Sequence, residues 1–151
     1  APTVTFATRD HSPADPLEVD RIRSVGGEVE CLSGGWRVGV DSTEGRWQVG
    51  VARSLGGSEW RAAGISDAAD LNAISLDEMH GGCIILGSDG IWGPLDSAGI
   101  NAAQRSEAVA SRVFERARVH GESAGTIAQD LVGAAAHAGG TDNACSIILL
   151  L

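Results

Sequence analysis

The sequence predicts an α+β fold in which helices pack on one face of a mainly antiparallel sheet. Three observations lead to this class. Up to residue 88, short runs rich in β-branched residues and tryptophan alternate with glycine turns, as in a meander of hairpins. Between residues 101 and 138, apolar residues instead recur at helical spacing. The chain then closes on an apolar run, 144–151, of the length expected for a buried strand.

The first part of the chain predicts a strand, a loop and a helix. Residues 3–8, TVTFAT, have the Thr and Val content of a strand. Asp15 is placed to cap a helix that begins at Pro16, since proline is tolerated in the first helical turn. Gly26 follows the last helical position and ends the helix. The side chains expected on its buried face are Leu17, Ile22 and Val25.

The middle and the end of the chain predict further strands and two helices. The segments expected to form strands before residue 90 are 28–32, 36–40, 46–52, 72–76 and 82–88. Two helices follow at 101–120 and 123–138. We expect the last strand, 144–151, to lie beside the strand at 82–88 and to pair with it in antiparallel fashion.

Composition and charge narrow the possible partners. The chain of 151 residues carries a net charge of −9, which argues against nucleic acid as a partner because phosphate backbones are bound by clustered Lys and Arg. No apolar run is long enough to span a bilayer, so no membrane partner is expected. The three cysteines are far apart and lack the spacing of a zinc site or a disulfide framework. We therefore expect an intracellular protein, cytoplasmic or nuclear.

Two aspartates lie beside the strands that are expected to pair. Asp89 directly follows the 82–88 strand, and Asp142 directly precedes the closing strand. If these strands pair antiparallel, both carboxylates come to one rim of the sheet. Two adjacent carboxylates repel each other unless a cation or a proton lies between them, and hard ions such as Mg²⁺ or Mn²⁺ take oxygen ligands. The alternative is that Asp-Gly and Asp-Asn are simply turn dipeptides.

Other candidate groups are weaker. The four histidines are scattered, and no serine has a neighbouring His-Asp arrangement that would make it a nucleophile. Arg53 and Arg61 flank a Gly-Gly turn, where Arg53 is a weak candidate for binding a substrate anion. The sequence therefore leaves the catalytic groups themselves unknown.

Several segments, taken in order, resemble the protein phosphatase 2C family of metal-dependent serine/threonine phosphatases. TRDHSPADPLEVDRIRSVGGEV is similar to the family's T-x-DH-x-P…E…RI…GG-x-V. WRVGV…WQVGVARSLGG is similar to its RV-x-G…L-A-V-S-R-x-x-G-D, and IILGSDGIWGPL to its L-I-L-A-S-D-G-L-W-D-x-L. LVGAAAHAGGTDNACSIILL matches its helix, G-S-x-D-N-x-T motif and closing strand. The resemblance covers nearly the whole chain.

The resemblance implies part of an αββα sandwich with a two-metal centre at one edge. The aspartates of the SDG and DN motifs are metal ligands in the family, and they correspond to Asp89 and Asp142. The implied cofactor is Mg²⁺ or Mn²⁺. The implied substrate is a phosphoserine or phosphothreonine protein, whose phosphorus is attacked by a metal-activated water.

The sequence also departs from the family pattern. The Asp-Gly-His-Gly metal motif and the phosphate-binding Arg of the family's N-terminal half do not occur in the 151 residues. Gly57 stands in place of the Asp of R-x-x-G-D, and Gly93 in place of the acid after Trp92. We therefore expect residues 1–151 to be the C-terminal portion of a phosphatase 2C-like domain, inactive without an N-terminal half or a protein partner. The alternatives are a catalytically inactive binding or regulatory domain, and a structural α+β domain.

Overall fold

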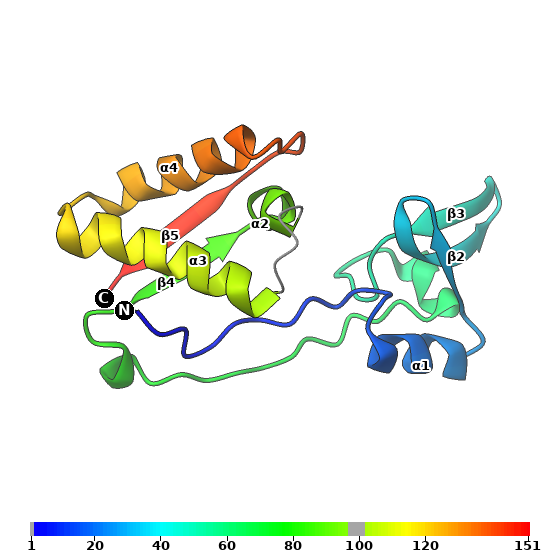
Figure 1. Ribbon diagram of the computed structural model, residues 1–151. Coiled ribbons are helices and arrows are strands. Elements are labelled where there is room, and N and C mark those ends of the chain that lie inside the picture. The colour runs from blue at the N-terminus through cyan, green and yellow to red at the C-terminus, as the bar shows by residue number, and fades with distance from the viewer. Residues whose placement is uncertain (1, 97–101) are drawn as a thin grey trace. The chain divides into compact units, whose positions relative to one another are not determined.

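The computed structural model describes residues 2–96 and 102–151, and the chain divides into two compact units (Figure 1). The three-stranded unit is Thr8–Asn72, and the helical unit is Ala73–Leu151 together with Ala1–Ala7. No helix within the described ranges is long and apolar enough to cross a membrane.

The three-stranded unit contains a helix, an antiparallel meander and a 3₁₀ helix. Its elements in chain order are α1 (Pro16–Ser24), β1 (Glu28–Leu32), β2 (Gly35–Ser42), β3 (Gly45–Val49) and η1 (Ser58–Ala63). The strands pair in the order β1-β2-β3, which confirms the predicted hairpins. Val29 lies opposite Val38, and both are buried under α1 and the loop that follows β3. The buried residues of this core are Ile22, Val29, Val38, Val40, Ala52 and Ile65.

Helix α1 begins as predicted but buries a different face. The Asp15 carboxylate accepts a hydrogen bond from the Leu17 amide at 2.9 Å, so it caps the first turn. Leu17 and Val25 are more than half exposed, which makes the predicted apolar face wrong at these two positions. Ile22 is fully buried, and the carboxylate-bearing Glu18 is buried beside it. Periodicity could not predict this, because one of the two partners of Glu18, Arg53, lies outside α1 and far along the chain.

The helical unit places helices on one face of a two-stranded sheet. Its elements in chain order are η2 (Leu76–Met79), β4 (Cys83–Gly87), α2 (Asp89–Asp96), α3 (Ala102–Phe114), the π-helical turn η3 (Glu115–Val119), α4 (Ala124–His137) and β5 (Ser146–Leu150). Helix α4 runs alongside β5 (Figure 1). The buried core of the unit consists of Ile91, Val109, Val113, Ile127, Leu131, Ala135 and Ile148.

Strands β4 and β5 pair antiparallel, as the sequence predicts. Ile85 lies opposite Ile148, and the ladder ends where Gly87 lies opposite Ser146. Ile148 packs among the helices, whereas its neighbours Ile147 and Leu149 are more than half exposed. Alternation along a strand sends successive side chains to opposite faces, so the helices cover one face of this sheet.

Three local expectations differ from the structure. Residues 3–8 and 72–76 form no strand, because neither segment has a hydrogen-bonded strand neighbour in the described part of the chain. The residues after Asp89 form the helix α2, which the sequence analysis did not predict. Pro94 lies inside this short helix, and proline within an apolar run is a weak signal for a helix.

Candidate metal-binding site

The turn between β4 and α2 places Asp89 at the first residue of a helix. The Ile91 amide donates to the Ser88 carbonyl at 2.9 Å, which starts the helix immediately after the strand. Ile91 is buried, and the Trp92 indole donates back to the Gly87 carbonyl at 3.0 Å. The apolar residues after Ser-Asp-Gly therefore belong to a helix that turns back onto the core. The Asp89 carboxylate remains exposed at the rim.

The segment that leads into β5 lies against this turn. The Ser88 amide donates to the Cys145 carbonyl at 3.0 Å, one step beyond the β4–β5 ladder. The Ser88 hydroxyl accepts from the Cys145 amide at 3.0 Å and donates to the Asn143 carbonyl at 3.3 Å. Asp142 immediately precedes Asn143 and is exposed. The structure thus brings the two aspartate-bearing segments into direct contact, as the strand pairing predicts.

Gly90 shows how close this contact is. A Cβ atom at Gly90 would stand 2.2 Å from the Asn143 carbonyl oxygen and 2.8 Å from the Asn143 carbonyl carbon. Gly90 is also buried. The segment can therefore pass over the first turn of α2 only because position 90 has no side chain.

The two carboxylates have the chemistry of hard-cation ligands. One oxygen of Asp89 accepts from the Gly90 amide at 2.9 Å, and one oxygen of Asp142 accepts from the Asn143 amide at 2.7 Å. Among the described residues, neither carboxylate is in an ion pair, and no group of three or more His, Cys, Asp or Glu side chains could hold a metal ion. Mg²⁺ is often bound by one or two carboxylates together with waters, so the rim fits part of a Mg²⁺ or Mn²⁺ site.

Arg53 lies in the three-stranded unit and is held by several partners. Its guanidinium donates two hydrogen bonds to Glu18, at 2.9 and 2.5 Å. It also donates to Asp70 at 2.8 Å and to the Ala68 carbonyl at 3.0 Å. The hydrogen bond to Glu18 raises the pKa of Arg53 above its ordinary value. These contacts favour a role in holding the fold, and its predicted role in anion binding stays a prediction.

Glu18, the glutamate in the first of the family-like segments, is a buried charged residue whose role the sequence did not predict. Its side chain is 2% exposed and lies between Arg53 and Arg21, whose Nη2 donates to it at 2.6 Å. Burial alone would raise the pKa of Glu18, but the hydrogen bonds from Arg53 and Arg21 outweigh it and hold that pKa below its usual value. The same network reaches the surface through Asp70, which lies 2.9 Å from the ring of His11.

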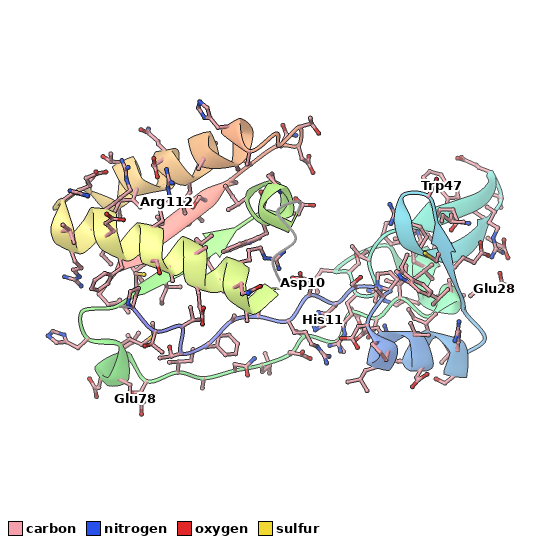
Figure 2. All side chains as sticks on the ribbon, viewed as in Figure 1. Asp10, His11, Glu28, Trp47, Glu78 and Arg112 are labelled. Atoms are coloured by element: carbon pink, nitrogen blue, oxygen red, sulfur yellow. The ribbon has the colours of Figure 1, made fainter. Side chains whose placement is uncertain are left out.

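A second ion-pair network joins two helices of the other unit. Arg112, which is labelled in Figure 2, lies on α3. It donates to Asp130 on α4 at 2.5 and 2.9 Å. Arg116 lies 3.2 Å from the same carboxylate. The hydrogen bond from Arg112 holds the pKa of Asp130 below its usual value. This network supports helix packing on the outer surface and is separate from the two aspartates of the rim.

A family model described as protein phosphatase 2C matches residues 2–144. The chain belongs to the protein phosphatase 2C family. It is 30% identical over 89 residues to protein phosphatase 1A from human and from cattle, an alignment that covers 59% of this chain and 22% of those proteins. It is 29% identical over 90 residues to probable protein phosphatase 2C 30 from Arabidopsis thaliana. The alignments therefore cover less than a quarter of the length of these curated relatives.

Solved phosphatase structures share the fold. A serine-threonine phosphatase 2C from Toxoplasma gondii matches 95% of this chain and 45% of its own length, with a TM-score of 0.67 and 21% identity. Another Toxoplasma gondii phosphatase matches 95% of this chain and 41% of its own length, with a TM-score of 0.68 and 19% identity. This likeness confirms the predicted fold class, with the phosphatase 2C fold covered in part.

Proposed function

We propose that this protein phosphatase 2C chain supplies two metal ligands, Asp89 and Asp142, to a centre that hydrolyses phosphoserine and phosphothreonine in proteins. The observation that carries the proposal is the direct contact between the β4–α2 turn and the segment 142–145. This contact gathers two exposed carboxylates at one rim, within a chain whose family membership is shown. The cofactor is Mg²⁺ or Mn²⁺.

The residues of this chain act by holding ligands in place. Asp89 at the start of α2 and Asp142 before β5 each use one oxygen for a local amide, which restrains the orientation of the carboxylate. The remaining oxygen of each side chain is then available as a ligand. Two divalent ions, when bound, lower the pKa of water and stabilise charge on the phosphoryl oxygens. This chemistry does not require a serine nucleophile. The sequence agrees with it, because no serine has a neighbouring His-Asp arrangement.

We further propose that residues 1–151 are the C-terminal portion of the catalytic domain. A two-ion centre needs several carboxylates and a cation that holds the phosphate. The described residues bring no third acid or histidine to the rim. The further ligands would come from polypeptide outside these 151 residues, in the same chain or in a partner.

A second candidate function is a phosphatase-like binding domain without activity. Gly57, which stands in place of a family acid, has a φ of 60°, and a Cβ there would lie 2.5 Å from the Trp60 ring. The loop is therefore built around glycine, so an aspartate cannot be restored there without moving Trp60. In a domain without catalytic activity, the replacement of this family aspartate by glycine would not impair function.

The experiment measures Mn²⁺ binding and phosphate release by the 151-residue chain. We expect weak Mn²⁺ binding that Asp89→Ala and Asp142→Ala each reduce, and no useful turnover of a phosphothreonine peptide at millimolar Mn²⁺. Robust turnover that either substitution abolishes would show that these residues suffice on their own. Binding that neither substitution affects would refute the metal site. An Asp-Gly-His-Gly stretch in the coding sequence upstream of Ala1 would favour the enzyme over the binding domain.

A further inference from the structure

We infer that Ser88 is a positioning residue for the metal site, because its hydroxyl holds the segment 142–145 against the β4–α2 turn. The inference rests on the proposed metal-binding role of Asp89 and Asp142. Ser88 itself is not assigned as a ligand; it acts through the backbone that carries Asp142.

The hydroxyl bridges two backbone groups of opposite polarity. It accepts from the Cys145 amide at 3.0 Å and donates to the Asn143 carbonyl at 3.3 Å. A hydroxyl has one donor and two acceptor positions, so a single Ser side chain can satisfy both groups at once. In Ser88→Ala, neither the Cys145 amide nor the Asn143 carbonyl would have a hydrogen bond to the side chain of residue 88.

The bridge stands where the ladder of the sheet stops. In the pairing of β4 and β5, the last two residues that lie opposite each other are Gly87 and Ser146. One further backbone hydrogen bond follows, from the Ser88 amide to the Cys145 carbonyl. Beyond that point, β4 gives way to α2 and offers no further strand backbone. The Ser88 hydroxyl takes the place of the missing ladder bonds, so the path of the chain through Asp142 depends on it.

The neighbouring serine provides a matched control. Ser146 lies in β5 opposite Gly87, and its hydroxyl is buried without a hydrogen-bond partner in the described structure. Ser146→Ala therefore removes the same atom from the same pair of strands without breaking a bond. Ser88→Thr retains the hydroxyl and serves as the conservative rescue variant.

The test compares these variants in the full 151-residue chain by two measurements. The first is the hydrogen-exchange rate of the Cys145 amide by NMR, and the second is the Mn²⁺ dissociation constant by electron paramagnetic resonance. Substitution of groups that orient metal ligands typically weakens metal affinity by about 10-fold or more. We expect Ser88→Ala to speed Cys145 exchange and to weaken Mn²⁺ binding by about 10-fold. Ser88→Thr and Ser146→Ala should leave both values near wild type.

The possible outcomes distinguish the positioning role of Ser88 from the metal-binding role of Asp89 and Asp142. Suppose that the folded Ser88→Ala chain binds Mn²⁺ as tightly as wild type, while Asp89→Ala binds it more weakly. That result would overturn the role of Ser88 but would still support the metal site. Unchanged exchange at Cys145 in Ser88→Ala would overturn the bridge itself. Mn²⁺ binding that Asp89→Ala leaves unchanged would refute the proposed metal site, and the inference with it.

Discussion

Two glycines of the same helix allow a controlled test of how tightly the rim is packed. In α2, a Cβ at Gly90 would stand 2.2 Å from the Asn143 carbonyl oxygen, whereas a Cβ at Gly93 would meet no described atom within 4 Å. Replacing glycine by alanine within a helix stabilises it by about 0.5–1 kcal/mol. Overpacking a filled site instead costs about 1–3 kcal/mol.

The two alanine variants should therefore move in opposite directions. We expect Gly93→Ala to raise the free energy of unfolding by about 0.5–1 kcal/mol. We expect Gly90→Ala to lower it by about 1–3 kcal/mol, because the segment around Asn143 must shift away. For a chain of this size, each kcal/mol corresponds to a change of about 2–4 °C in Tm.

The measurement is thermal unfolding followed by circular dichroism, with Mn²⁺ affinity measured on the same samples. Gly90→Ala should weaken Mn²⁺ binding, since it displaces the backbone beside Asp142. Gly93→Ala should leave Mn²⁺ binding unchanged. Equal stability and equal Mn²⁺ affinity in the two variants would refute the close contact between α2 and the segment before β5.

Further predictions concern charge, pH and thiols. Glu18→Gln should lower the free energy of unfolding by about 2–4 kcal/mol in a urea titration, because two arginines lose their buried partner; the exposed Glu59→Gln is the control. Since the folded-state pKa of Glu18 is lowered, its contribution should be complete above about pH 4.3 and be lost as the pH falls through that lowered pKa. A Glu18→Gln chain whose stability fell with acid as steeply as wild type would contradict this. Burial raises the pKa of the Cys83 thiol, so iodoacetamide at neutral pH should alkylate the exposed Cys31 and Cys145 before Cys83; mass spectrometry of the peptides shows the order.

Local patterns were sufficient wherever short-range chemistry decides the structure. Asp15 and Pro16 predict the start of α1 because a side-chain cap and a fixed φ act within one turn. The apolar runs at 82–88 and 144–151 predict an antiparallel pair, which the structure confirms. The rim with Asp89 and Asp142 follows from that pairing, so the sequence by itself located the two candidate ligands.

Tertiary structure decided everything that depends on partners distant in the sequence. Glu18 is buried, and Leu17 next to it is exposed, because Arg53 reaches Glu18 from 35 residues away. Residues 72–76 have the composition of a strand but form none, since a strand requires a hydrogen-bonded neighbour; residues 72–75 are irregular and Leu76 begins η2. The bridge from Ser88 to Asn143 spans 55 residues, and the Ser-Asp-Gly pattern that contains Ser88 does not indicate which backbone groups its hydroxyl contacts. Propensity acts over a few residues, whereas burial and hydrogen bonding are settled only when distant segments meet.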